Sequence, residues 1–174
     1  MNTSIGLFEE CLDWLRKYYS SYRFYTERDV VWTCQEHIRN AIDKNNLEYR
    51  VFSNLGVIPH KPRRIAPDLS IVNANGQVEL IIEFKYEPTH FRFDIPREKF
   101  PIVFWGMDGV EKDIHRLDDF IGSGLVQYAY AILIDEGGYF RRRPAFPNSQ
   151  WIDWENGVSI LLGERHRSSA HVGE

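Results

Sequence analysis

Apolar residues in the first quarter of the chain recur at the spacing of helices. Residues 7–18 follow this pattern, and a short helix packed onto the main body is expected there. A longer helix is expected over residues 26–44, with Thr26 as its N-cap and two acidic residues in its first turn. The apolar stripe of this helix consists of Val30, Val31, Cys34, Ile38, Ala41 and Ile42.

The middle of the chain changes to strand patterns. One strand is expected within residues 47–58, a second over 68–73 and a third over 78–86. Residues 88–101 contain three prolines and should be irregular. The three strands can pair as an antiparallel meander.

A second major helix is expected over residues 108–121, where apolar residues again share one face and a Gly-Ser-Gly sequence follows. Residues 125–134 form an apolar run typical of a buried strand, and residues 158–162 predict a last strand. The polar tail after Gly163 is expected to fray. The order is helix, three strands, helix, strand, and the second helix can carry the chain across to the further strand.

The connection between the second and third strands predicts how they pair. Asn75-Gly76 is typical of a type I′ hairpin turn, because both residues tolerate positive φ. With this pair at the tip, Asp68 lies opposite Glu83, and Lys85 joins the same face two positions on. The other face should be core because it is continuously apolar: Leu69, Ile71, Val78, Leu80, Ile82 and Phe84.

Two carboxylates directly opposite each other in a sheet repel, so a nearby positive charge should offset this cost. A divalent cation such as Mg²⁺ would do so, because hard cations prefer carboxylate oxygen, and Lys85 would do so in part. The alternative interpretation of Glu83 and Lys85 is a ladder of alternating charges on a half-exposed strand.

Pro67-Asp68, followed after fourteen residues by Glu83-Phe84-Lys85, resembles the motif of the PD-(D/E)XK nuclease superfamily. That group includes many restriction endonucleases and Holliday-junction resolvases. The resemblance covers roughly residues 22–135. It implies an α/β fold with a restriction-endonuclease-like core, in which a mixed central sheet is flanked by helices in the order αβββαβ. We accordingly expect a single domain, residues 1–174, with a C-terminal extension over 136–174.

The resemblance also implies roles for these residues. Asp68 and Glu83 would bind Mg²⁺, with Mn²⁺ as a substitute, and the backbone carbonyl of Phe84 would help. Lys85 would position or activate the attacking water and stabilise negative charge. These roles agree with the general physics of metal-assisted phosphodiester hydrolysis.

Many members of that superfamily have another acidic residue on the first core helix, and Glu27 and Glu36 are the candidates here. They lie on opposite faces of the predicted helix. Glu27 continues the apolar stripe, an unusual place for an acid, whereas Glu36 lies on the solvated side. Glu27-Arg28 is also similar to the start of this helix in resolvase-like members. We expect Glu27 to assist catalysis; the alternative is an acid that only favours the helix dipole.

Basic side chains in two places are candidates for contacts with DNA phosphates. These are His60, Lys61, Arg63 and Arg64 just before the second strand, and Lys112 and Arg116 on the second major helix. The first group would stand at the mouth of the expected site. The second pair lies one helical turn apart, and its alternative is a solvated face shared with the neighbouring acids.

Overall charge and composition limit the possible partners and locations. The net charge of −4 counts mildly against nucleic acid, because phosphate binding favours basic surfaces. No apolar run is long enough to cross a bilayer, and the sequence has no recognisable signal peptide, so a membrane partner is not expected. Cys11 and Cys34 lack metal-type spacing and suggest reduced thiols in a cytoplasmic protein.

The leading hypothesis is a Mg²⁺-dependent endonuclease that hydrolyses DNA phosphodiester bonds. A homodimer would be a natural arrangement for cutting two strands. Two alternatives remain open: a catalytically inactive nuclease fold that acts as a binding or assembly module, and a nuclease subunit whose protein partner supplies DNA specificity. The net acidity motivates both alternatives.

Overall fold

The computed structural model describes residues 3–58 and 66–167. The helices are α1 (Ser4–Tyr18), α2 (Glu27–Lys44) and α3 (Val110–Gly122), with short 3₁₀ turns η1 (Tyr19–Ser21), η3 (Arg97–Lys99) and η4 (Glu155–Gly157). The strands are β1 (Arg50–Ser53), β2 (Leu69–Val72), β3 (Val78–Glu87), β4 (Tyr128–Glu136), β5 (Ser149–Asp153) and β6 (Val158–His166).

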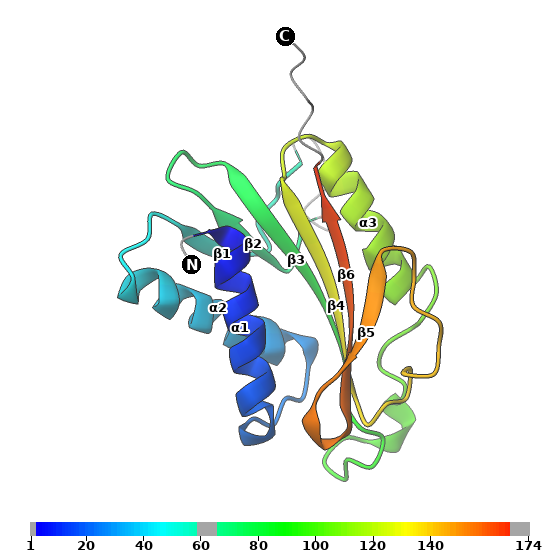
Figure 1. Ribbon diagram of the computed structural model, residues 1–174. Helices are drawn as coiled ribbons and strands as arrows, with labels where there is room; N and C mark the ends of the chain where they lie inside the picture. Colours follow the sequence, from blue (N-terminus) through cyan, green and yellow to red (C-terminus); the bar gives the residue numbers. More distant parts are fainter. Residues whose placement is uncertain (1–2, 59–65, 168–174) are drawn as a thin grey trace.

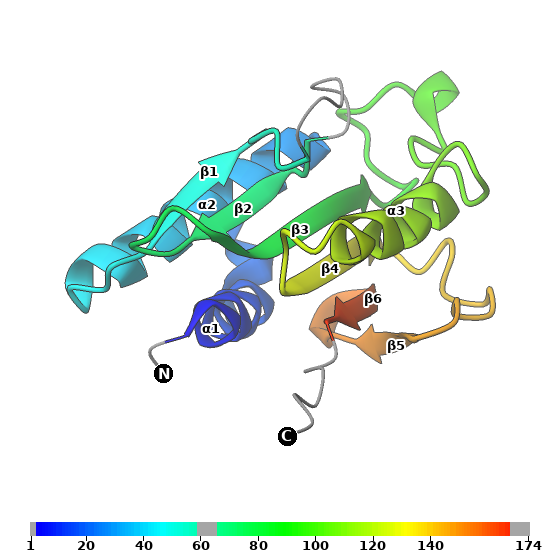
Figure 2. The same ribbon diagram turned by 90° about the horizontal axis from the view of Figure 1, so that it is seen from above.

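Within the described chain the strands form one sheet in the order β1-β2-β3-β4-β6-β5. Strands β3 and β4 are parallel, and all other neighbours are antiparallel. Helices α1 and α2 lie on one face of this sheet and α3 on the other (Figures 1 and 2). The expected α/β class, the mixed sheet flanked by helices and the order of α2 to β4 are therefore confirmed.

Two hydrophobic cores hold the layers together, one on each face of the sheet. The first joins α1 and α2 to the face of β2 and β3 that contains Leu69, Ile71, Leu80, Ile82 and Phe84. The predicted core face is therefore correct for these five residues, whereas Val78, beyond a bulge in the pairing, packs against the other core. The opposite face of β3 and β4 is also buried, because α3 covers it with Ile114, Leu117 and Phe120.

The hairpin between β2 and β3 has the expected register but a different turn. The Gly76 amide donates to the Asn73 carbonyl, and Gly76 has a φ of 77° whereas Asn75 is not among the residues with positive φ. This is a turn of negative-φ residues closed by a left-handed glycine, not the predicted type I′ turn. A bulge between Ile71 and Val72 then shifts the register by one residue. The different turn and the bulge compensate for each other, so Ser70 pairs with Ile81 as predicted.

The C-terminal part differs most from expectation. Strand β5 was not predicted, and β6 continues to His166, so the expectation of fraying from Gly163 is wrong for residues up to His166. Strand β6 pairs with the whole of β4 and so belongs to the central sheet. Among the described residues, no helix has the length and apolar character needed to cross a membrane.

Candidate active site

The candidate site lies where β3 loses one of its neighbours. Strand β2 begins at Leu69, opposite Ile82, so β3 continues past this point with only β4 beside it. Asp68, one residue before β2, takes over the lost pairing: its Oδ2 accepts a hydrogen bond of 2.7 Å from the Phe84 amide. A backbone donor at the open sheet edge is thereby satisfied, and the Asp68 carboxylate is fixed beside β3.

Glu83 points to the face of β3 that α3 covers. Its side chain is only 3% exposed, and Oε1 lies 3.0 Å from Nη2 of Arg116 on α3. Arg116 also donates to the Ala66 carbonyl at 3.3 Å. Arg116 was predicted to contact DNA, and the structure gives this guanidinium an internal role, because it lies against a buried carboxylate.

Lys85, two residues further on, is surrounded by oxygen atoms from three elements. Its Nζ lies 3.1 Å from Glu27 Oε2 on α2, 2.9 Å from Asp113 Oδ2 on α3 and 2.9 Å from the Phe84 carbonyl. Helices from opposite faces of the sheet can both reach this ammonium because β3 has an open edge here. The structure thus brings Asp68, Glu83, Lys85 and Glu27 together.

The choice between the two acids of α2 agrees with their contacts. Glu27 is the first residue of α2, where a capping box fixes the start of the helix: Thr26 accepts from the Asp29 amide, and Asp29 accepts from the Thr26 amide. Glu27 faces Lys85, whereas Glu36 pairs with Arg39 on the exposed side of the helix.

Asp113 is a member of the cluster that the sequence analysis missed; it was considered only as one of the acids of a possible solvated face around Lys112 and Arg116. It is 2% exposed and contacts Lys85. A signal was present, because Asp113 stands three residues after Val110 and four before Leu117, on the apolar stripe. The reasoning that selected Glu27, an acid on an apolar face, applies equally to Asp113.

Among the remaining predicted DNA contacts, one lies within the described residues and is not part of the cluster. Lys112 is exposed on the outer side of α3. His60, Lys61, Arg63 and Arg64 lie outside the described residues.

Burial raises the pKa of three carboxyl groups in this cluster. Desolvation is the main cause for Glu27, Asp68 and Glu83. The pKa of Glu83 is raised well above its ordinary value, because repulsion from Asp68 adds to desolvation and the attraction of Arg116 offsets only part of both. The hydrogen bond from the Phe84 amide moderates the raised pKa of Asp68.

The pKa of Lys85 is also raised, but for an amine this shift favours the charged form. Desolvation alone would lower its pKa, but the attraction of Asp113, Glu27 and Asp68 outweighs burial and raises the pKa above the ordinary value. Lys85 therefore stays protonated at neutral pH. It can donate hydrogen bonds and stabilise negative charge, but it does not accept a proton.

The carboxylate oxygens of Asp68 and Glu83 and the Phe84 carbonyl are the kind of ligand that a hard divalent cation prefers. Glu83 Oε1 and Asp113 Oδ2 lie close to cationic side chains without hydrogen-bond geometry, and within the described chain these buried oxygens lack a hydrogen-bond donor. In the part of the chain that the structure describes, no group of three or more His, Cys, Asp or Glu side chains is arranged around a common metal position. The expected Mg²⁺ ligands are fewer than three such side chains: two carboxylates and one backbone carbonyl. This number is sufficient because Mg²⁺ usually keeps several water ligands.

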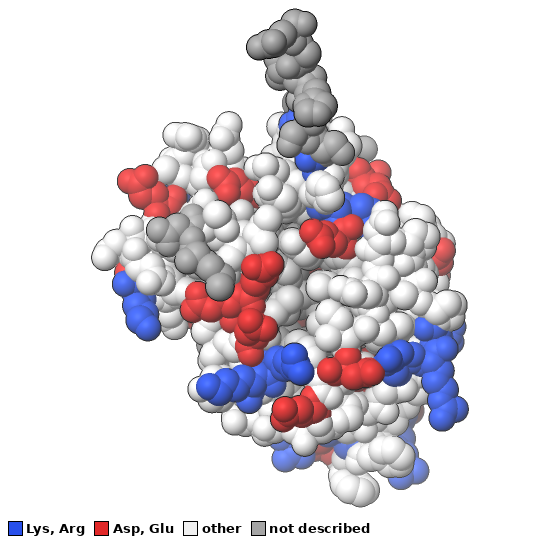
Figure 3. All heavy atoms as spheres, in the orientation of Figure 1, with Lys and Arg blue, Asp and Glu red and all other residues white. Residues whose placement is uncertain are grey.

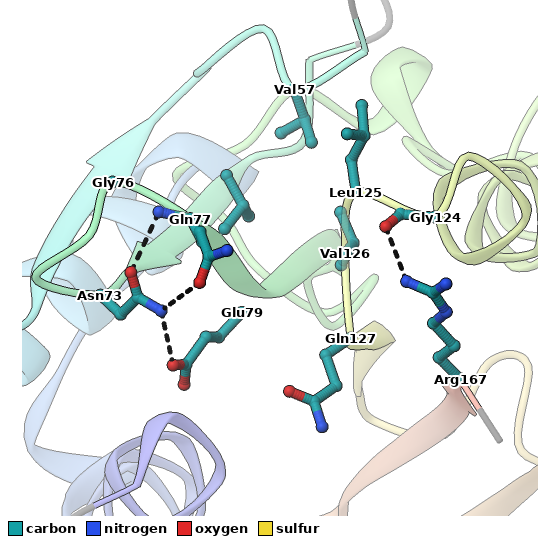
Figure 4. Close-up of a pocket in the computed structure, with 11 residues that line it drawn as sticks. Val57, Asn73, Gly76, Gln77, Glu79, Gly124, Leu125, Val126, Gln127 and Arg167 are labelled. Carbon is teal, nitrogen blue, oxygen red and sulfur yellow. Dashed lines mark hydrogen bonds between the residues drawn. The ribbon is translucent and has the colours of Figure 1, made fainter. Parts of the chain in front are cut away.

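A cavity lies elsewhere on the protein, away from these residues. A cavity of about 650 Å³ separates the β2–β3 hairpin from the connection between α3 and β4 (Figure 4). Its polar side chains are largely paired: Asn73 donates to Glu79 at 3.0 Å, and Arg167 donates to the Gly124 carbonyl at 2.9 Å. No residue of the acidic cluster lines this cavity, so size alone does not indicate the site here.

Charges of both signs are interspersed on the face of the molecule seen in Figure 3, without an extended basic surface. This agrees with the net charge of −4. DNA binding on this face would therefore depend on local contacts rather than on a broad positive field.

No family model matches the chain, and no curated protein or solved structure matches it.

Proposed function

We propose that this protein is a Mg²⁺-dependent endonuclease of the PD-(D/E)XK type that hydrolyses DNA phosphodiester bonds. The observation that supports the proposal best is the convergence of Asp68, Glu83, Lys85 and Glu27 at one open sheet edge. The α2-β1-β2-β3-α3-β4 order supports it further, since it is the order expected of a restriction-endonuclease-like core.

An excess of negative charge favours a metal ion at this place. Four carboxylates, Glu27, Asp68, Glu83 and Asp113, surround two cationic groups, Lys85 and Arg116. Burial raises the pKa of three of these carboxyl groups, so ionising them all without a further cation is costly. Asp68, Glu83 and the Phe84 carbonyl would hold Mg²⁺, which when bound would supply Lewis-acid stabilisation of charge on the phosphoryl oxygens.

The protein side chains divide the remaining tasks. Lys85, held protonated between Glu27 and Asp113, orients a nucleophilic water and stabilises the negative charge that develops on phosphate. Glu27 is better suited to accept the proton of that water, because burial raises its pKa toward neutrality. Asp113 and Arg116 act on the reaction through Lys85 and Glu83, which they position.

The test combines cleavage with metal binding. Purified protein should nick plasmid DNA in millimolar Mg²⁺ or Mn²⁺, and Asp68→Asn and Lys85→Met should each reduce the rate by at least about a hundredfold. Isothermal calorimetry should show Mg²⁺ binding to the wild type and to Lys85→Met, but weaker binding to Asp68→Asn. Equal cleavage by all three proteins, or no metal binding by the wild type, would contradict the proposal.

One observation favours a second candidate, a non-catalytic module with this fold. Lys85 and Arg116 already neutralise Asp113 and Glu83 at 2.9 and 3.0 Å, and both of these acids are buried under α3. Such a network can serve stability alone. In that case calorimetry would detect no Mg²⁺, and Lys85→Met would lower stability without affecting any cleavage.

A further inference from the structure

The connection between β3 and α3, residues 88–109, places large apolar side chains in solvent. Phe93 is 97% exposed and Phe91 84%, and three further members of the connection, Ile102, Phe104 and Met107, are also exposed. Single exposed apolar residues are ordinary, but several within one short connection indicate a contact surface. Other residues of the same connection pack inward: Ile95 and Val103 are buried.

The two phenylalanines are held on a fixed support. Arg92, between them, donates twice to Asp94 at 2.7 Å and once to the Phe24 carbonyl at 2.9 Å. Its guanidinium also lies 5.0 Å from the ring of Tyr25. The backbone that presents Phe91 and Phe93 is therefore tied to the segment that leads into α2.

Both ends of this support are close along the chain to residues of the candidate site. Phe24, the acceptor of Arg92, precedes Glu27 by only three residues. The other end of the connection is fixed by Glu87 at the end of β3, whose Oε2 accepts from the Val103 amide at 2.7 Å. The connection that carries the exposed rings thus leaves the sheet two residues after Lys85, where β3 terminates (Figure 1), and Arg92 ties it to the segment that leads to Glu27.

The charge of this connection suits contact with bases better than contact with phosphates. Its charged residues balance, with Arg92, Arg97 and Lys99 against Asp94, Glu98 and Asp108. Phosphate recognition needs a surplus of basic side chains, whereas base stacking needs only exposed aromatic faces.

We propose that Phe91 and Phe93 stack on unpaired bases next to the scissile phosphate, so that the substrate is DNA with a bubble, flap or branch rather than uniform duplex. The inference rests on the proposed nuclease function and narrows its substrate class. Stacking on an aromatic ring tolerates every base, so the preference is for DNA structure and not for sequence. A fixed backbone allows the rings to act without an ordering cost on binding.

The test measures DNA affinity in Ca²⁺, where hydrolysis is not required, with fluorescently labelled bubble and duplex DNA of equal length. Wild-type protein should bind the bubble at least about fivefold more tightly than the duplex for one stacked base. Phe91→Ala/Phe93→Ala should lose this preference while its affinity for duplex stays the same. Both side chains are nearly fully exposed, so the double replacement should not disturb folding.

Two matched variants distinguish ring stacking from a general apolar contact. Phe91→Tyr/Phe93→Tyr keeps the rings and should keep the preference, whereas Phe91→Leu/Phe93→Leu keeps apolar surface and should lose it. Leu125→Ala is the positional control, since Leu125 is exposed at the opposite end of the sheet, where β4 begins, and it should bind as the wild type does. Equal binding of the leucine variant and the wild type to the bubble would overturn the stacking proposal.

Other outcomes are also decisive. Loss of self-association in the alanine variant, seen by analytical ultracentrifugation with unchanged DNA affinity, would overturn the proposal and assign the surface to a contact between copies of the chain. A ring-dependent preference in Ca²⁺ without any cleavage in Mg²⁺ would support stacking and contradict the nuclease function. Cleavage in Mg²⁺ with no bubble preference would support the nuclease and contradict stacking.

Discussion

Lys85 shows how one side chain can connect two layers of the protein. Its ammonium contacts Glu27 from the helix layer on one face of the sheet and Asp113 from the helix on the other. Removing a charged group from such a partly buried network leaves its partners uncompensated. Changes at single residues should therefore affect stability and the proposed activity in different ways, depending on which partner is removed.

Replacement of Glu83 gives a prediction about pH. Because its folded-state pKa is raised above the unfolded value, the native protein binds the Glu83 proton more tightly than the unfolded chain does. The contribution of Glu83 to stability is then fully present below about pH 4, the ordinary carboxyl range, and is lost as pH rises through the raised pKa. In the absence of metal, urea denaturation should show that the free energy of unfolding decreases between about pH 4.5 and about pH 7. Glu83→Gln should flatten this dependence; an unchanged slope would contradict the assignment.

Glu27 and Glu36 form a matched pair on one helix. Glu27→Gln should reduce DNA cleavage at least about tenfold, because the neutral amide cannot accept a proton from water. Glu36→Gln should cleave as the wild type does, since Glu36 pairs with Arg39 on the exposed side of the helix. Initial rates in Mg²⁺ at several pH values would measure both effects, and equal rates for the two variants would remove Glu27 from the proposed mechanism.

At the scale of elements, α3 matters because its first turns deliver Asp113 and Arg116 to β3. The start of α3 depends on a close backbone approach: the Val110 amide donates to the Phe104 carbonyl at 2.9 Å. Gly109, the N-cap residue, has no side chain in this space. A Cβ at that position would stand 1.7 Å from the Phe104 oxygen.

Gly109→Ala should therefore destabilise the protein by about 2 kcal/mol, as expected when backbone must move to relieve a clash. Gly122→Ala at the other end of α3 is the control, because a Cβ there meets nothing within 4 Å. Alanine also favours helix over glycine, so this variant should be neutral or more stable by up to about 1 kcal/mol. Thermal denaturation of both variants measures the difference, and equal midpoints would show that the close approach at Gly109 is unimportant.

At the scale of the whole molecule, the described part of the C-terminal region is built into the central sheet. Strand β6 pairs with β4 along its full length, and its Ile160 and Leu161 enter the cores on opposite faces of the sheet. The expected core of residues 22–135 therefore lacks the strand that completes one side of β4.

A chain that ends at Glu136 should fail to fold cooperatively. The loss of β6 would leave the backbone groups of buried β4 unpaired on one side and would open both cores. Circular dichroism with urea denaturation would test this, and a cooperative transition with the wild-type midpoint would show that residues 1–136 fold without β6.

The sequence alone determined the local features. Helix periodicity placed α1, α2 and α3, and the N-cap Thr26 was identified correctly because capping depends on neighbouring residues only. Alternation along β2 and β3 put Asp68, Glu83 and Lys85 beside one another, although the turn type was wrong, because the face that must be buried limits the register more strongly than the turn does.

The tertiary structure alone decided which groups meet. Asp113 joins Lys85, and Arg116 turns to Glu83, because α3 packs across the neighbouring strand β4, and no local spacing encodes that packing. The pairing of β6 with β4 likewise depends on contacts between residues far apart in the chain. Local propensity acts over a few residues, whereas the charge balance and the pKa values of this cluster arise from burial between layers that only the folded chain brings together.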